Sequence, residues 1–219
     1  MQTELGLRER KKQQTRQLIA ETARRLFAEH GFDAVPVADV ARAAEVSEAT
    51  VFNYFPTKED LVFQGMEAFE DELLRAVRDR PAGEPAAAAF GRFVTQPRGL
   101  LAAPDEQAAG HLLGVARMIA QSPALLARER DIFARYTASL AALLAEETGC
   151  TPLDTRPQVV AAALVGLHAA LIGYVRLRLA DGLTDLAQLS RDVHAEASRA
   201  LQVLDDGLAA YAPKQPARG

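Results

Sequence analysis

Apolar side chains recur every three or four residues over long stretches of this sequence, and no other feature constrains the fold as strongly. In the first such stretch the recurring positions are Leu18, Ile19, Thr22, Ala23, Leu26 and Phe27. Residues at this spacing gather on one face of an α-helix. Because no segment reads convincingly as a strand, the sequence predicts an all-α protein.

Capping and helix-breaking residues divide the chain into about nine predicted helices. Gly31 can end a helix in the left-handed conformation, Pro36 suits a helix start, and Ser47 is a good N-cap. Thr57 caps a fourth helix that we expect to be continuous. The predicted helices cover about 11–30, 37–44, Ser47 to Phe55, 58–80, 86–95, 105–121, 123–148, 158–180 and 187–210.

Composition limits the compartment and the chemistry. Apolar residues make up 49% of the 219 residues and charged residues 25%, a balance that excludes disorder as the main state. No apolar run reaches the roughly 18 residues that span a bilayer without charge, and the charged N-terminus has no secretory signal. A cytoplasmic location without membrane contact is therefore expected. The single Cys150 fits a reducing compartment, and no metal site or cofactor is expected.

The charges are unevenly distributed along the chain, whose net charge is −4. In residues 8–16, five basic side chains stand against one acidic side chain: Arg8, Arg10, Lys11, Lys12 and Arg16 against Glu9. A basic segment on an acidic protein is a place where phosphate can be bound. The same pattern is also typical of a solvated helix start.

The second and third predicted helices are short, and Glu45 and Val46 join them by a tight link. This is the pattern of a helix-turn-helix, in which the second helix lies in the major groove and the first braces it on the backbone. Helix pairs at this spacing also occur in many other helical proteins, so the spacing alone leaves DNA binding open.

Four segments around this helix pair carry a more specific signal. They read LFAEHGF at 26–32, VADVA at 37–41, VSEATVFNYF at 46–55 and PTKEDL at 56–61. In order, spacing and the aromatic end of the third helix, residues 16–61 resemble the DNA-binding domain of the TetR family of transcriptional repressors. The resemblance covers about a quarter of the chain. It implies a three-helix DNA-binding domain at 8–57 and a helical effector-binding and dimerisation domain at 58–212.

The resemblance places three residues where family members approach base edges: Glu48, Ala49 and Phe52. A glutamate can accept a hydrogen bond from a cytosine amino group, and an alanine methyl can touch a thymine methyl. Phe52 fits packing as well as base contact. Val51 and Phe55 are expected in the core.

Other positions match residues that meet phosphates or bases in the family. Thr50, Asn53 and Tyr54 supply a hydroxyl, an amide and a ring there, and Lys58 matches a common phosphate contact. Ser47 is first a helix cap, with a phosphate contact as its second role. Such phosphate contacts position a protein on the duplex, whereas base contacts specify sequence.

The sequence departs from the family in two respects. Val35 and Pro36 stand where the family usually has hydroxyl residues, so the usual contact of the second helix with DNA is not predicted. Residues 1–55 contain eight basic and eight acidic side chains, so this region is neutral. Since non-specific DNA affinity comes from counterion release, we expect it to be weak and to depend on residues 8–16.

The C-terminal part contains a helix that is apolar nearly all round between Val159 and His168. Such a helix must be buried on most sides. Together with the apolar face of the last helix, it predicts a four-helix interface between two subunits, as the resemblance also implies. A two-fold dimer reads a palindromic operator.

The effector pocket of this family would be mostly apolar with a few polar groups. The polar candidates are His111, Arg117, His168 and Tyr174. Each also fits an ordinary role as a core histidine, a solvated arginine or an interface tyrosine.

The predicted function is a homodimeric, ligand-responsive transcriptional regulator and not an enzyme. It would repress by binding a double-stranded palindromic operator and leave it when a small apolar or amphipathic effector binds. An activator, a regulator without an effector, and a dimer with a degenerate DNA domain are alternatives. A helical enzyme or a carrier of apolar ligands is the alternative from another class, although the HExxH, GxSxG and Gly-rich phosphate-loop motifs are absent from the sequence.

Overall fold

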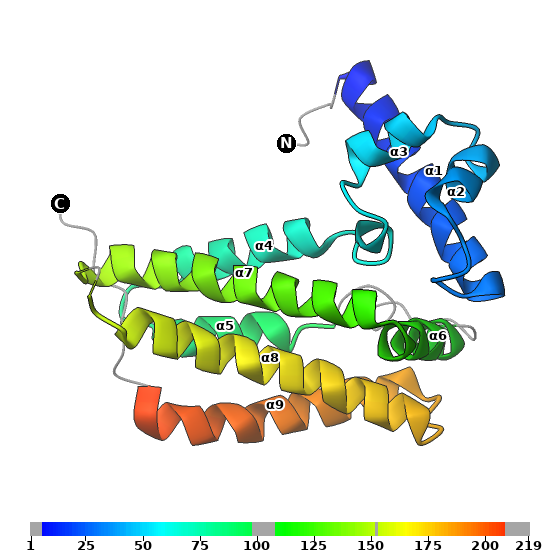
Figure 1. Cartoon of the computed structure of the whole chain (residues 1–219). Helices are drawn as coiled ribbons and strands as arrows, with labels where there is room; N and C mark the ends of the chain where they lie inside the picture. The colour runs from blue at the N-terminus through cyan, green and yellow to red at the C-terminus, as the bar shows by residue number, and fades with distance from the viewer. Residues whose placement is uncertain (1–5, 98–107, 152, 209–219) are drawn as a thin grey trace. The chain divides into compact units, whose positions relative to one another are not determined.

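A computed structural model describes residues 6–97, 108–151 and 153–208. Within these residues the chain forms nine α-helices and one 3₁₀-helix and contains no strand (Figure 1), which confirms the all-α prediction. The chain forms two compact units. The first contains residues up to Met66 together with Arg117–Glu129, and the second contains the remaining described residues.

The first unit contains a three-helix arrangement around a small apolar core (Figure 1). Its elements are α1 (Leu7–His30), α2 (Val37–Ala43), α3 (Glu48–Tyr54) and the 3₁₀-helix η1 (Glu59–Leu61). The chain leaves α1 at Gly31, which has φ +84°, and the Gly31 N–H donates to the Phe27 carbonyl. The core side chains, all at most 3% exposed, include Ile19, Ala23 and Phe27 of α1, Val40 and Ala41 of α2, Val51 of α3, and Phe55. The first three predicted helices are therefore confirmed.

The prediction of one continuous helix over 58–80 is wrong. The segment forms the short turn of η1, and α4 (Met66–Arg78) starts five residues after it. Gly65 separates the two with φ +85°, a left-handed conformation that glycine adopts without steric cost. The apolar spacing of this segment is helical on both sides of the interruption, so the periodicity could not indicate it.

The remaining helices lie mainly in the second unit. They are α5 (Ala86–Val94), α6 (Ala108–Gln121), α7 (Pro123–Thr148), α8 (Arg156–Ala180) and α9 (Leu186–Leu208). These confirm the predicted helices, with α7 at its predicted bounds. The end of α6 and the start of α7, Arg117–Glu129, belong to the first unit. The predicted helix start at 105, helix end at 210 and domain end at 212 lie outside the described residues. The predicted domains at 8–57 and 58–212 stay predictions.

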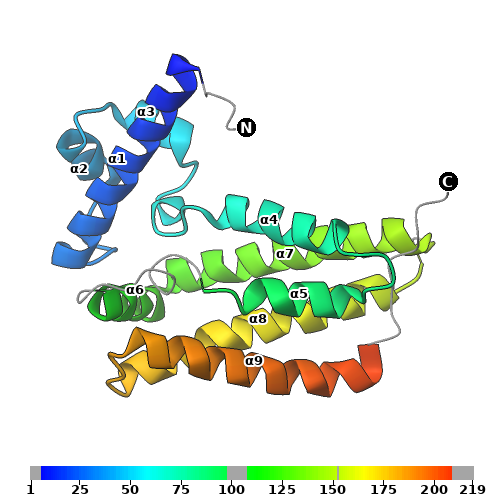
Figure 2. The same ribbon diagram turned by 180° about the vertical axis from the view of Figure 1, so that it is seen from behind.

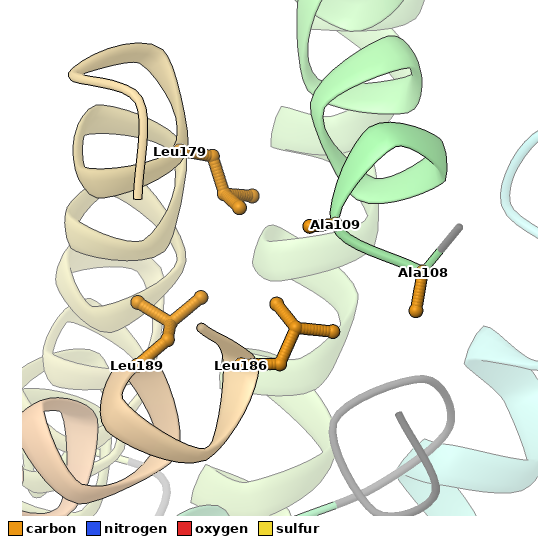
Figure 3. Packing of buried hydrophobic residues seen from close by; sticks show 5 residues of the cluster. All are labelled: Ala108, Ala109, Leu179, Leu186 and Leu189. Atoms are coloured by element: carbon orange, nitrogen blue, oxygen red, sulfur yellow. The ribbon is translucent and has the colours of Figure 1, made fainter. Parts of the chain in front are cut away.

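Within the second unit, α8 and α9 lie antiparallel and side by side (Figures 1 and 2). Leu167 and Leu171 of α8 and Ala197 of α9 form an apolar cluster, on which Leu201 also packs. A Cβ atom at Gly91 of α5 would lie 2.3 Å from the Leu201 side chain, so glycine allows α5 to approach α9 closely. A second cluster joins the start of α6 to the corner between α8 and α9 (Figure 3); its members are Ala108, Ala109, Leu179, Leu186 and Leu189.

Two charged side chains buried in the second unit have charged partners. Glu70 is 9% exposed and accepts hydrogen bonds from Arg135 Nε at 2.8 Å and from Ser139 Oγ at 2.6 Å. Arg80 is 3% exposed and pairs with Glu147 at 2.7 Å. Buried charges persist when partners compensate for their lost hydration. These pairs join α4 and its C-terminal continuation to α7.

α8 is long and apolar enough to cross a membrane by length and composition alone, but only 33% of its most apolar window is buried inside the chain. Five of the exposed apolar positions of α8 follow helical spacing along one face. They are Val159, Ala162, Gly166, Ala170 and Leu177, and we refer to them as the α8 stripe.

Candidate nucleic-acid interface

The N-terminal turn of α3 is fixed by its own side chains. Ser47 Oγ accepts the Thr50 N–H at 3.1 Å, as an N-cap does, and the hydroxyl oxygens of Ser47 and Thr50 lie 2.8 Å apart. The predicted cap at Ser47 is therefore confirmed. Contacts of either hydroxyl with DNA stay predictions.

The two faces of α3 differ sharply. Val51 and Phe55 are each 1% exposed, which confirms that both belong to the core. On the opposite side Glu48, Ala49 and Asn53 are exposed, and so is 46% of Phe52. The two remaining predicted residues of this helix, Thr50 and Tyr54, are half-buried. A seven-residue helix with this arrangement presents its first turn and one aromatic ring to a partner.

The turn between α2 and α3 contains a residue in a costly conformation. Glu45 has φ +56°, and the Val46 N–H donates to the Ala41 carbonyl at 2.9 Å. This bond is typical of a Schellman ending, in which glycine is the usual left-handed residue. The sequence predicted a tight link here but not its left-handed residue.

The start of α2 lacks a side-chain cap. Pro36 is the N-cap residue and makes no capping hydrogen bond, and the helix begins at Val37 as predicted. Because Pro36 stands where the family usually has a hydroxyl residue, no side chain accepts a hydrogen bond from the free N–H groups at the start of α2.

A hollow of about 590 Å³ opens beside the end of α3. Its lining consists of Glu9, Lys11, Lys12, Thr15 and Tyr54, and we refer to it as the basic hollow. The structure thus brings the predicted basic segment and the predicted Tyr54 together. Two ammonium groups against the one carboxylate of Glu9 leave the hollow with a net positive charge, which together with the phenol suits an anion such as a phosphate group.

Arg16 has a role that the sequence did not indicate. Its Nη1 atom donates to the Tyr54 carbonyl at 3.0 Å, and its guanidinium carbon lies 4.7 Å from the centroid of the Phe55 ring. A cation at the C-terminal end of a helix is stabilised by the unpaired carbonyls there. Arg16 therefore braces α3 from α1. Its partner lies 38 residues away, which no local sequence pattern could indicate.

Lys58 is half-buried and faces protein groups. Its Nζ atom donates to the Phe32 carbonyl at 2.6 Å and lies 4.3 Å from the centroid of the Phe32 ring. Burial lowers the pKa of Lys58, while the charges of Asp33 and Glu59 act to raise it. The predicted phosphate contact of Lys58 stays a prediction.

Asp60 connects the turn after α3 to the start of α7. Asp60 Oδ2 accepts the Thr57 N–H at 3.0 Å, and Thr57 Oγ1 accepts the Asp60 N–H at 3.3 Å, so Thr57 closes the turn of η1 and does not cap the long helix predicted there. Asp60 Oδ1 accepts from Arg128 Nε at 2.9 Å and Nη2 at 2.6 Å. The buried hydroxyl group of Ser122, the residue directly before α7, donates a hydrogen bond to Asp33 Oδ1 at 3.2 Å. All these residues belong to the first unit.

The four predicted effector residues occupy different environments. His111 and Arg117 are exposed on α6. Tyr174 on α8 accepts a hydrogen bond from Arg178 at 3.0 Å. His168 stacks on Phe69, with ring centroids 5.0 Å apart.

His168 belongs to an aromatic cluster that the sequence did not indicate. Phe69 of α4 also stacks on Tyr136 of α7 at 5.8 Å, and Phe133 meets the His168 ring edge-on at 6.1 Å. Burial and the charge of nearby Glu70 raise the pKa of Tyr136, so its phenol stays neutral. One feature of the sequence could have indicated a polar group in this region: Glu70 is a charged residue at a position of α4 where the helical period expects an apolar one.

Family models match both parts of the chain. The model described as "Bacterial regulatory proteins, tetR family" matches residues 19–64, which include all eight predicted DNA-binding residues. The model described as "MftR C-terminal domain" matches residues 98–209.

Known proteins agree with these matches. The HTH-type transcriptional regulator TcmR of Streptomyces glaucescens is 32% identical over 84% of this chain and 82% of its own. The putative mycofactocin biosynthesis transcriptional regulator MftR of Mycobacterium tuberculosis is 28% identical over 72% of this chain and 78% of its own. The crystal structure of NalD from Pseudomonas aeruginosa has the same fold, with a TM-score of 0.54 and 19% identity over 86% of this chain and 97% of NalD. The chain therefore belongs to the TetR family and is a DNA-binding transcriptional regulator, not an enzyme.

Proposed function

We propose that this regulator is a cytoplasmic homodimeric repressor that binds a palindromic operator and leaves it when a small apolar or amphipathic effector binds. The observation that carries the proposal is the uncovered face of α3 beside the basic hollow. The proposed DNA-binding residues are Ser47, Glu48, Ala49, Thr50, Phe52, Asn53 and Tyr54, while sequence resemblance alone implies a phosphate contact for Lys58.

Base reading is assigned to the first turns of α3. Glu48 and Ala49 are exposed in the first turn, where a recognition helix meets base edges. Phe52 exposes 46% of its surface to water, which is unfavourable for an aromatic ring in the free protein. Contact with thymine methyl groups would remove this ring from water.

Phosphate binding is assigned to the basic hollow. Lys11 and Lys12 are exposed there, and the phenol of Tyr54 lies beside them. Because the DNA-binding region is neutral overall, these two lysines would supply a large part of the counterion release on binding.

Dimerisation is assigned to the α8 stripe. The stripe exposes Val159 and Leu177 to 60% and 65% in a single chain, and a Cβ atom at Gly166 would contact nothing. A second copy with the same stripe would cover these groups across a two-fold axis. Such a dimer presents two α3 helices to two half-sites, which suits a palindromic operator.

Effector binding is assigned to the aromatic cluster around Phe69 and His168. Apolar rings next to the buried Glu70 and its partner Arg135 provide the combination of apolar wall and few polar groups that small-molecule sites use. Of the four predicted effector residues, His168 is supported by this cluster, while His111, Arg117 and Tyr174 stay predictions.

Transmission of the signal is assigned to α7. Arg128 of this helix pairs with Asp60 in the turn that follows α3. Arg135 of the same helix pairs with Glu70 of α4, next to the aromatic cluster. The two arginines are seven residues apart and so share one face of α7. An effector that displaces the Glu70 pair would move α7 and thereby the turn after α3, with a coupling of typically about 1–3 kcal/mol.

The experiment that tests the function measures binding of the purified protein to its own upstream intergenic DNA and to a scrambled duplex, in about 0.15 M salt. We expect selective binding of the upstream duplex by the wild type and loss of that selectivity in Tyr54→Ala. If upstream DNA is not preferred, the operator is sought by selection from random duplexes. Absence of any selected sequence would contradict the proposed function.

A further inference from the structure

The ammonium group of Lys58 is engaged by the protein on more than one side. Besides the 2.6 Å hydrogen bond to the Phe32 carbonyl, it lies 4.3 Å from the Phe32 ring centroid and 5.8 Å from that of Phe27. A partly buried cation over an aromatic face gains from the ring quadrupole as well as from the hydrogen bond. Binding a DNA phosphate would require Lys58 to weaken these contacts.

The other lysines of the first unit stand in clear contrast. Lys11 and Lys12 are exposed and line the basic hollow. Their ammonium groups can meet phosphate without giving up a buried partner. Within one DNA-binding unit the chain therefore contains lysines in two different electrostatic settings.

The hydrogen bond of Lys58 links the segment after α3 to the segment after α1. Lys58 follows the end of α3 by four residues, and Phe32 lies in the corner that follows α1. The carbonyl of Tyr54, the last residue of α3, is held by Arg16. Two cations therefore tie both ends of the Tyr54–Lys58 segment, which begins with the last residue of α3, to the region of α1.

We propose that Lys58 is a positioning residue for DNA recognition: it orients α3 by holding the Phe32 carbonyl and does not neutralise a DNA phosphate. The inference rests on the proposed reading of DNA by α3. It differs from the role that sequence resemblance implies for this position.

Salt dependence separates the two roles. A side chain that neutralises a phosphate contributes about 0.9 to the slope of log Kobs against log salt, and it weakens binding to all sequences alike when removed. A residue that orients the recognition helix contributes nothing to this slope. Its loss weakens specific binding and leaves non-specific binding unchanged, because only base contacts depend on that orientation.

The experiment compares the wild type with Lys58→Met and with the matched control Lys12→Met. The probes are a duplex that the wild type selects from random DNA and a scrambled duplex, titrated between about 0.05 and 0.3 M salt. For Lys58→Met we expect about tenfold weaker binding to the selected duplex, unchanged binding to the scrambled duplex and an unchanged slope. For Lys12→Met we expect weaker binding to both duplexes and a slope reduced by about 0.9 per bound subunit.

A second measurement uses only the wild type, so it does not depend on the folding of a variant. Lysine acetylation by a small reagent is followed by mass spectrometry, with and without the selected duplex. We expect DNA to slow acetylation of Lys11 and Lys12 and to leave the rate at Lys58 unchanged within about twofold, because the partners of Lys58 are within the protein.

Several outcomes would overturn the inference. They are a lower salt slope in Lys58→Met, equal weakening on both duplexes, unchanged selectivity of this variant, or DNA protection of Lys58 from acetylation. A wild type that does not prefer its selected duplex would instead refute the proposed operator recognition. The two failures are therefore distinguishable.

Discussion

At the scale of single residues, Glu45 stands out because three helix ends of this chain share one hydrogen-bond pattern. α7 and α8 end at Gly149 and Gly182, with φ +62° and +91°, and the N–H of the following residue donates to the carbonyl five residues before it. α2 ends in the same way at Glu45, with φ +56°. A side chain in this conformation costs about 1 kcal/mol, which glycine avoids.

We therefore expect Glu45→Gly to stabilise the protein. The predicted gain is up to about 1 kcal/mol, or a rise of about 2–4 °C in Tm, partly offset by the larger backbone entropy of glycine in the unfolded chain. Thermal unfolding measures it. Glu45→Ala is the control, since it removes the same charge but keeps a Cβ atom. An equal rise in Tm for both variants would assign the effect to charge and not to the backbone.

Glu48 gives a prediction about sequence specificity. Its carboxylate is exposed in the first turn of α3, where it can accept a hydrogen bond from a cytosine amino group. We expect Glu48→Ala to relax preference at one base pair of each half-site by about 1–3 kcal/mol and to leave the other positions unchanged. Binding to duplexes with single base-pair changes measures this.

The matched control is Glu67→Ala, which removes an acidic side chain from the first turn of α4. It should keep the full base preference of the wild type. If Glu48→Ala strengthens binding equally to every duplex, Glu48 acts only as a negative charge near DNA.

Some residue roles can be predicted from sequence because the helical period alone determines which side chains share a face. The spacing within α3 sends Val51 and Phe55 to the core and leaves Glu48 exposed, as predicted. The hydrogen bonds of Arg16 and Lys58 could not be predicted in this way. Their carbonyl partners are 38 and 26 residues away and depend on how α1 and α3 pack.

At the scale of elements, the sequence predicts the existence of each helix better than its continuity. The bounds of α7 follow from the Ser122–Pro123 start, which both local sterics and periodicity favour. The break between η1 and α4 could not be predicted, because a single left-handed residue, Gly65, does not change the spacing of the apolar residues on either side of it. The sequence pattern likewise predicts that Arg128 is part of a long helix. Its contacts, however, place it in the first unit, which the pattern does not indicate.

The contact between α7 and the turn after α3 is tested by a double-mutant cycle with Asp60→Asn and Arg128→Gln. Both side chains are largely buried, with 15% and 29% exposed, and both guanidinium donors share one carboxylate oxygen. We expect a coupling of about 1 kcal/mol in the free energy of unfolding, measured with urea at one protein concentration.

The Arg25–Glu29 pair on α1 provides the control cycle. Its side chains are 57% and 48% exposed and its atoms are 3.5 Å apart, so its coupling should stay below about 0.5 kcal/mol. If the Asp60–Arg128 coupling is no larger than this, α7 does not transmit a signal through that pair.

At the scale of the whole molecule, the α8 stripe is the surface on which the proposed dimer, and with it the binding of two chains to one operator, depends. α8 is apolar enough to resemble a membrane span, yet its exposed positions follow one face and include small residues that allow another helix to approach. Apolar helix faces of this kind on a regulator are typical of subunit interfaces. The sequence predicted such an interface from the apolar run that starts at Val159, but only the structure identifies which positions of α8 the chain leaves uncovered.

Ala170→Arg is therefore expected to abolish the dimer, because it would bring two guanidinium groups and their hydration to an apolar two-fold contact. Light scattering after gel filtration should give the mass of one chain instead of two. Operator affinity should fall more than tenfold, since each monomer reaches a single half-site. The control is Ala68→Arg, which places the same side chain at an exposed position of α4 and should leave both mass and affinity unchanged. If Ala170→Arg keeps the mass of two chains, the dimer uses another surface, and the assignment of dimerisation to the α8 stripe is refuted.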